Sequence, residues 1–294
     1  MLKLGWKRSK LIWPYIFLLP FFLLFAVFIA WPIAYSFYLS LFEKVGLGKG
    51  TYIGFQNYLK LLKDPVFRIS LKNTLWYVIG TLLFQIPLAL FLAIIVNSPM
   101  IKMKSFLTGI FFLPVITSGV AISIIFSILL DYRYGLLNMI MEKIGLNPIN
   151  WLQDMKVVMN SIIMIGIWRY AGQNMVYFLA GLQGISEELY EAAKVDGANK
   201  WQLFRHITLP SLTPTIVFVI IMHMIGAFQV FDVPFLITGG GPANASTTIN
   251  IYLYRNAFTF FNMGYGSAIA YALVCIILTI SIIQLKIFGV FRGE

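Results

Sequence analysis

Three side chains that can ionise or carry a proton lie within long apolar stretches of the sequence, namely Arg169, His223 and Asp232. Such groups are costly to place in a membrane and are therefore candidate functional groups. Each also has a structural interpretation. Arg169 can reach the interface or pair with a neighbouring helix, and His223 can donate to a carbonyl across a helix contact. Asp232 lies near the outer end of its stretch, where water can reach it, and here we favour the structural role.

The rest of the chain offers little catalytic or metal-binding chemistry. The only histidines are His206 and His223, there is no HExxH motif, and Cys275 is the single cysteine. A metal hydrolase therefore has no ligand set. The GxxxxGK[ST] phosphate loop is also absent, so any ATP must be hydrolysed by another subunit. We expect no catalytic residue, no metal site and no cofactor in this chain.

The elements that position these groups are predicted to be membrane-spanning helices. Of the 294 residues, 60% are hydrophobic and 11% are charged, whereas about a quarter are charged in a soluble domain. Five uncharged stretches each exceed the roughly 20 residues that a helix needs to cross a bilayer, and a sixth contains Arg169. We predict an all-α integral membrane protein with one transmembrane domain over residues 1–294. Its six spans lie at approximately 13–40, 73–97, 105–130, 157–183, 211–236 and 264–288.

The net charge of +11 raises the question of nucleic-acid binding. The basic residues lie between the spans and form no basic helical stripe with aromatic residues, so we exclude nucleic acid as a partner. Basic residues at positions 3, 7, 8 and 10 favour a cytoplasmic amino terminus. Six spans then place the carboxyl terminus, with Arg292, on the same side. Over all loops the basic residues divide almost evenly, so the orientation depends on the first cluster and on the loop described next.

The loop at residues 184–209 has an unusual pattern. Ser186 can cap a helix whose first turn holds two glutamates, which the helix dipole favours. Gly197 can then supply a left-handed bend. The residues alone leave two interpretations open, a compact knob that docks into another protein or a helix lying on the lipid surface. Four acidic residues in this loop fit poorly with a negatively charged leaflet.

The run EAAKVDGA at 191–198, followed by ITLP at 207–210, resembles the signature cytoplasmic loop of importer-type ABC permeases. In that family the loop seats in a cleft of the ATPase subunit and transmits its closure to the membrane helices. The resemblance implies that Glu191 pairs with a basic group on the ATPase and that Gly197 permits the bend. The docking residues that it implies are Glu191, Ala192, Ala193, Asp196, Gly197 and Ala198.

Three further segments resemble landmarks of the carbohydrate-uptake permeases of this family, in their short six-span form. They are GFQNYLKLLKDPVF at 54–67, FLPVITSGVA at 112–121 with YGLLN at 134–138, and FDVPFLITGGGP at 231–242. The resemblance implies a bacterial or archaeal cytoplasmic membrane. It also implies a second related permease, two ABC ATPase subunits that bind ATP and Mg, and an extracytoplasmic sugar-binding protein.

Alignment with the sugar-contacting positions of the maltose permease of this family implies a substrate path in two parts. The first part is Arg169, Tyr170 and Gln173, and the second is His223, Gly226, Ala227 and Val230. The second set is spaced i, i+3, i+4 and i+7, which is one helix face. A tyrosine can stack on a pyranose ring, and an amide or imidazole can bond hydroxyls.

Several alternatives stay open at this point. The path identities differ from those of the maltose permease, so a site is expected while maltose itself is not. Arg169 could favour an acidic sugar, and the partner permease could hold most of the contacts. The rival function is a self-contained secondary transporter, which needs an ion or proton relay at the midplane. One aspartate and one histidine make a poor relay, and the loop at 184–209 would then have no role.

Overall fold

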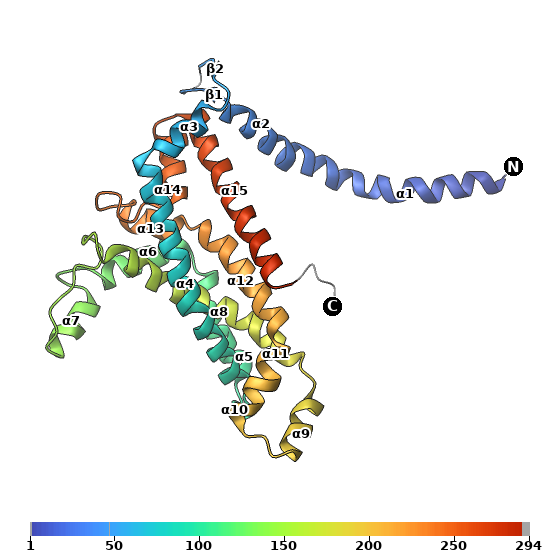
Figure 1. Cartoon of the computed structure of the whole chain (residues 1–294), viewed down its shortest axis with the longest axis vertical. Helices are drawn as coiled ribbons and strands as arrows, with labels where there is room; N and C mark the ends of the chain where they lie inside the picture. Colours follow the sequence, from blue (N-terminus) through green and yellow to red (C-terminus); the bar gives the residue numbers. More distant parts are fainter. Residues whose placement is uncertain (1, 47, 290–294) are drawn as a thin grey trace. The chain divides into compact units, whose positions relative to one another are not determined.

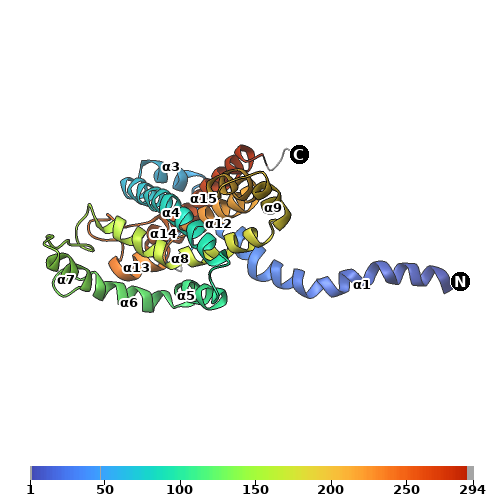
Figure 2. The same cartoon turned by 90° about the horizontal axis from the view of Figure 1, so that it is seen from below.

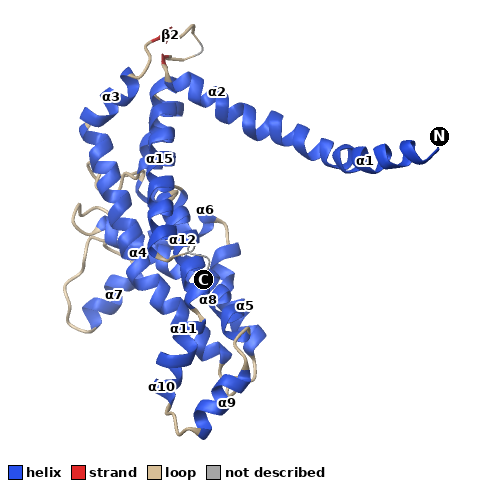
Figure 3. Ribbon diagram, turned by 45° about the vertical axis from the view of Figure 1, so that its right-hand side comes forward, coloured by secondary structure: helices blue, strands red, loops and turns tan. Residues whose placement is uncertain are grey.

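The computed structural model describes residues 2–46 and 48–289, and nearly all of its regular structure is helical (Figure 3). The only strands among these residues form one short hairpin. The predicted residue Arg292 lies outside the described part of the chain. The chain divides into two compact units, one of Met1–Lys63 with Leu253–Ala272 and one of Asp64–Tyr252 with Leu273–Glu294.

The first unit begins with a long helix in three consecutive segments, which is apolar over Trp13–Ser40. They are α1 (Leu2–Phe25), the π-helical η1 (Ala26–Ala30) and α2 (Trp31–Ser40). The hydroxyl of Tyr271 in α15 (Met263–Ile287) donates to the carbonyl oxygen of Ile33 at 2.5 Å. This bond fixes α2 against the start of α15.

A hairpin and a short helix complete the first unit. Strands β1 (Phe42–Glu43) and β2 (Thr51–Tyr52) pair antiparallel, and they are followed by α3 (Gln56–Lys63). The side-chain amide of Asn57 in α3 donates to the carbonyl oxygens of Ser40 at 2.8 Å and Phe42 at 3.0 Å. These bonds satisfy backbone groups where α2 ends, which explains why the polar Asn57 is buried.

The second unit is a helical bundle (Figure 1). Its longer helices are α4 (Pro65–Asn97), α5 (Lys104–Ile116), α6 (Gly119–Leu129), α8 (Val158–Gln183) and α12 (Thr213–Phe228). The shorter segments are α7 (Leu136–Lys143), α9 (Glu187–Val195), α10 (Lys200–Leu203), η2 (Phe204–Thr208), α11 (Leu209–Ser211) and α13 (Asp232–Thr238). Helix α14 (Ile249–Tyr254) crosses the boundary between the units along the chain, and the π-helical η3 (Arg255–Thr259) and the first part of α15 belong to the first unit.

Helix α8 is the centre of this bundle, with α4 on one side and α5 on the other (Figure 2). A hydrophobic core joins the last turns of α4 and α8 to the first turns of α12, with Phe178 and Leu212 fully buried in it. Helices α4 and α8 therefore run in the same direction and α12 runs back. The Nζ atom of Lys104 donates to the carbonyl oxygen of Asn97 at 2.8 Å, so α5 starts at the end where α4 stops.

The predicted span at 105–130 is not one continuous helix. It is broken between α5 and α6, whose axes differ by 92°. Thr117 and Ser118 have ψ angles of 140° and 134°, and the Ser118 side chain accepts from the backbone N–H of Val120 as the cap of α6. A serine with extended backbone is a strong helix start. Because residues 105–130 contain no charged residue, the charge pattern alone does not reveal this break.

The predicted span at 211–236 is made of α12, which ends at Phe228, and α13, which begins at Asp232, and Thr213–Thr238 counts as one candidate span. Among the described residues, four helices are long and apolar enough to cross a membrane, or five if the bent α5–α6 pair counts as one span. Helix α8 is not among them, since residues such as Gln173 and Asn174 lower its mean hydropathy. The chain is a multi-pass membrane protein, and the count of six spans stays a prediction.

Candidate substrate cavity and docking loop

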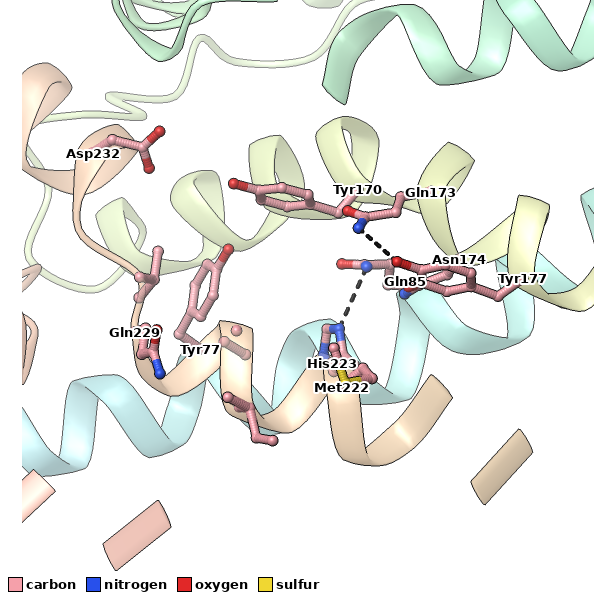
Figure 4. Close-up of a pocket in the computed structure, with 14 residues that line it drawn as sticks. Tyr77, Gln85, Tyr170, Gln173, Asn174, Tyr177, Met222, His223, Gln229 and Asp232 are labelled. Atoms are coloured by element: carbon pink, nitrogen blue, oxygen red, sulfur yellow. Dashed lines mark hydrogen bonds between the residues drawn. The ribbon is translucent and has the colours of Figure 1, made fainter. Parts of the chain in front are cut away.

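A cavity of about 330 Å³ lies within the second unit, among α4, α8, α12 and the start of α13 (Figure 4). Its lining combines aromatic rings, amides and small apolar side chains. The lining residues are Tyr77, Gln85, Tyr170, Gln173, Asn174, Tyr177, Met222, His223, Ile225, Gly226, Ala227, Gln229, Val230 and Asp232. Asp232 is the only one of them with an acidic or basic side chain apart from the imidazole of His223.

The two parts of the predicted substrate path, one at residues 169–173 and one at residues 223–230, lie at the same cavity. Six of the seven predicted path residues line it: Tyr170, Gln173, His223, Gly226, Ala227 and Val230. Their ability to bind a ligand remains a prediction. An added Cβ at Gly226 would meet no atom within 4 Å, so this glycine faces open space and no close helix contact. The seventh predicted residue, Arg169, lies behind the wall.

Arg169 is buried and forms an ion pair with Asp232, with 2.5 Å between Nη1 and Oδ2. The pair links α8 to the first residue of α13. The Arg169 guanidinium also lies 5.0 Å from the ring centroid of Tyr170, at cation–π distance. This ion pair agrees with the structural role that we favoured for Asp232. Its partner, Arg169, is 63 residues away along the chain.

The ion pair also depends on a close approach by α6. A Cβ built at Gly119 would lie 2.5 Å from Asp232 Oδ2 and 3.5 Å from Arg169 Nη1. Gly119 is the first residue of α6, immediately after the break in the helix. The bend between α5 and α6 therefore brings a residue without a side chain against the carboxylate, where a larger residue would displace it.

His223 is held by hydrogen bonds to α4. Its Nε2 lies 3.1 Å from Thr81 Oγ1, and its Nδ1 lies 3.4 Å from Gln85 Nε2. The Thr81 hydroxyl already donates to the carbonyl oxygen of Tyr77 at 2.8 Å, so it accepts from Nε2–H, and Nδ1 accepts from the amide of Gln85. A neutral imidazole meets both requirements. His223 thus acts first as a link between α12 and α4, which is closer to its structural interpretation.

The side-chain amides of Gln173 and Asn174 in α8 differ in their hydrogen bonding. Gln173 Nε2 donates to the hydroxyl of Tyr177 at 3.0 Å (Figure 4). In contrast, Asn174 Nδ2 is buried and has no hydrogen-bond partner among the described residues. A buried amide without a partner is uncommon and calls for an explanation. Asn174 is one of the lining residues of the cavity, so a ligand is a candidate partner for this nitrogen once the side chain turns toward the cavity.

Sequence reasoning missed several of the lining residues, notably Tyr77, Gln85, Asn174 and Tyr177. A signal for them existed. Tyr77 and Gln85 are eight residues apart and share one face of α4, and Gln173 and Tyr177 are four apart on α8. A search for polar stripes within apolar stretches, in addition to charged residues, would have found them.

The loop at 184–209 forms a helix–turn–helix at the end of the second unit, beyond the last turn of α8 (Figure 1). Two local predictions are confirmed. Ser186 caps α9 by accepting from the backbone N–H of Glu188 at 3.3 Å, and Gly197 has a φ of +82°. The N–H of Gly197 bonds the carbonyl of Lys194, and that of Ala198 bonds the carbonyl of Ala193. This pair of bonds is the Schellman motif that ends a helix on a left-handed residue.

This loop exposes much of its apolar surface. No residue of α9 or α10 is buried, and Val195 is 88% exposed. A hollow of about 310 Å³ between α9 and η2 is lined by four of the six predicted docking residues: Ala193, Asp196, Gly197 and Ala198. Glu191 and Ala192 are exposed beside it. The hydroxyls of Tyr190 and Thr208 lie 2.9 Å apart and tie α9 to the segment that leads into α12.

Among the described residues, no three His, Cys, Asp or Glu side chains are grouped so that they could hold a metal ion. The side chains present at the two sites are suited to recognition. The cavity can bond and stack on a polar ligand, and the loop can present an acidic and apolar surface to another protein.

Comparison with known proteins places these features in one family. The profile of the binding-protein-dependent transport system inner membrane component matches residues 85–287. The chain is 39% identical to the arabinooligosaccharides transport system permease protein AraP of Bacillus subtilis (strain 168), over 99% of this chain and 94% of that one. It is 35% identical to the lactose transport system permease protein LacF of Rhizobium radiobacter, over 92% of each chain.

A solved structure agrees with this relationship. A chain of the bacterial alginate ABC transporter, crystallised in complex with an alginate pentasaccharide-bound periplasmic protein, has a TM-score of 0.86 at 26% identity and 98% coverage of both chains. The resemblance to ABC importer permeases of the carbohydrate-uptake type is confirmed. This protein belongs to the family of binding-protein-dependent transport system inner membrane components.

Proposed function

We propose that this chain is a permease subunit of an ATP-binding-cassette importer for sugars, and that the cavity among α4, α8 and α12 is part of its translocation path. The observation that carries the proposal is this polar cavity inside a bundle of apolar helices. Relatives that are named as permeases for arabinooligosaccharides and lactose support a sugar as the substrate.

The cavity lining suits a sugar in particular. Sugars present many hydroxyls and one apolar ring face, so their sites combine a few hydrogen-bonding groups with aromatic surfaces. Tyr170 and Tyr77 offer ring faces, while Gln173 and Asn174 offer amides. Gly226 and Ala227 leave room beside them. Arg169 contributes through Asp232 and Tyr170, and makes no direct contact with the cavity.

The loop at 184–209 is proposed to dock into a separate ATPase subunit, which binds the ATP and Mg. Its contact residues are Glu191, Ala192, Ala193, Asp196, Gly197 and Ala198. The capped helix α9 and its Schellman turn make this loop compact, and apolar side chains such as Leu189 and Val195 are exposed on it. Because the loop lies where α8 ends and α12 begins, a pull on it acts directly on two helices that line the cavity.

The loop at 184–209 defines the proposed orientation of the chain in the membrane. It faces the cytoplasm, and the six-span arrangement then places both termini on that side of a bacterial or archaeal cytoplasmic membrane. The parallel course of α4 and α8, with α12 running back, supports alternate crossings. A second permease, two ATPase subunits and an extracytoplasmic sugar-binding protein complete the proposed complex. Coupling requires that each partner contacts the two conformations of the permease differently.

The test is reconstitution of the chain in proteoliposomes with its proposed partners, namely the ATPase, the second permease and the sugar-binding protein. The proposal expects sugar uptake that needs ATP and the binding protein. The control preparation contains the chain alone, with an imposed proton or sodium gradient. Uptake by that preparation would overturn the proposal in favour of a secondary transporter.

A further inference from the structure

The charge of the cavity is set by one ion pair. Asp232 lines the cavity, and its side chain is 42% exposed. The Arg169 side chain is only 9% exposed, and its Nη1 lies 2.5 Å from Asp232 Oδ2. The two formal charges cancel at the wall. The remaining polar lining consists of phenols, amides and the imidazole of His223, whose two hydrogen bonds require the neutral form.

We propose that the cavity selects uncharged sugars, because Asp232 cancels the positive charge with which Arg169 would otherwise attract a carboxylate or sulfonate. This inference rests on the proposed function, and it answers the question of acidic substrates that Arg169 raised in the sequence. Asp232 occupies Nη1 of the guanidinium, so a ligand anion that is to bind this atom must first displace the carboxylate.

Displacement of Asp232 is opposed by the packing around it. The carboxylate is held between Arg169 and the backbone of Gly119, where even a Cβ would lie 2.5 Å from Oδ2. The guanidinium carbon also lies over the Tyr170 ring, 5.0 Å from its centroid. A free carboxylate entering the cavity would also meet the negative Asp232 before it met Arg169. The arrangement thus admits hydroxyls and rejects anions.

The test varies the charge while it keeps the shape of the cavity. Asp232→Asn leaves one positive charge, Arg169→Gln leaves one negative charge, and the double variant Arg169→Gln with Asp232→Asn leaves none. Gln229→Lys adds a positive charge at an exposed lining residue without touching the ion pair. It therefore remains informative if Asp232→Asn does not fold.

The measurement is direct sugar binding to the assembled transporter in nanodiscs without its binding protein, by saturation-transfer NMR. The two probes are a neutral arabinotriose and an alginate trisaccharide. We expect the parent protein and the double variant to prefer the neutral probe. The ratio of acidic to neutral binding should rise about tenfold in Asp232→Asn and Gln229→Lys, which corresponds to about 1.4 kcal/mol for one added charge.

Two results are decisive against the inference. A parent protein that prefers the acidic probe would overturn it directly, as would a ratio that stays the same in both Asp232→Asn and Arg169→Gln while neutral binding persists. If the parent protein binds neither probe, the proposed sugar path itself fails, and the selectivity inferred for it fails too.

Discussion

The Nε2 atom of His223 in α12 lies 3.1 Å from the hydroxyl of Thr81 in α4, and the two residues are 142 positions apart in the sequence. The hydroxyl is occupied as a donor toward its own helix, so it can only accept from the imidazole. Gln85 then supplies the second bond. The sequence predicts that His223 bonds sugar hydroxyls. In the structure its two hydrogen bonds link α12 to α4.

Replacement of His223 tests whether its hydrogen bonds to α4 stabilise the fold. His223→Ala removes both bonds and leaves the Gln85 amide without its partner, which costs about 1–3 kcal/mol when the group is buried. We expect a lower unfolding temperature of the detergent-solubilised protein, measured by differential scanning fluorimetry. The control is His206→Ala, an exposed histidine in η2. Equal stability of the two variants would contradict the interpretation.

Gly226 and Gly172 provide a matched pair of substitutions. Gly226 lines the cavity, whereas Gly172 lies in the contact between α8 and α5. Gly226→Leu adds a side chain where an added Cβ meets no atom within 4 Å, so folding should be unaffected while the cavity is partly filled. ATP-driven sugar uptake should then fall severalfold at a constant amount of membrane-inserted protein.

Gly172→Ala is expected to act in the opposite way. A Cβ at this position on α8 would collide with the carbonyl oxygen of Phe111 in α5. Overpacking of this kind costs about 1–3 kcal/mol. The amount of monodisperse protein in size-exclusion chromatography should fall for Gly172→Ala and hold for Gly226→Leu. A normal uptake rate in Gly226→Leu would show that the cavity lies off the path.

Gly197 provides a test of the docking loop. Its φ of +82° is closed to proline, so Gly197→Pro should destroy the Schellman turn, abolish uptake and leave membrane insertion intact. Gly197→Asn is the control, since asparagine tolerates the left-handed region, whereas most other residues lose about 1–2 kcal/mol there. The readouts are uptake and co-purification of the ATPase subunit. The docking role would be refuted by a proline variant that still retains the ATPase and transports normally.

Local signals in the sequence were reliable where the structure is local. Ser186 and Gly197 bound one short helix, and their cap and turn geometry follow from neighbouring residues alone. The face of α12 that carries His223 and Gly226 follows from helical spacing in the same way. These features could be predicted because each depends on a few consecutive residues.

Other features depend on contacts between distant segments. The partner of Arg169 is 63 residues away, and the break at Thr117 lies within a long run that contains no charged residue. The contribution of α4 to the cavity was also missed, because Tyr77 and Gln85 carry no charge. In each case the missing information was the packing of one helix against another, which a single sequence expresses only weakly.

Asn174 tests the relation between stability and function in the cavity. Its Nδ2 is buried without a partner among the described residues, which is unfavourable for the fold by about 1–3 kcal/mol. Asn174→Leu replaces the amide by an apolar group of similar shape, so the unfolding temperature should stay the same or rise. If the amide donates to a sugar hydroxyl, uptake should nevertheless fall by about tenfold, the factor for 1.4 kcal/mol.

The matched control for this change is Asn160→Leu on the same helix. Asn160 is exposed, lies outside the cavity and accepts a bond from Trp76 at 2.8 Å. Its replacement should leave uptake within about twofold of the parent rate, a change of less than 1 kcal/mol. A variant Asn174→Leu that unfolds earlier than the parent would show that the amide has a structural partner. One that transports at the parent rate would remove Asn174 from the sugar site, because a buried donor that serves neither the fold nor the ligand has no remaining role in this cavity.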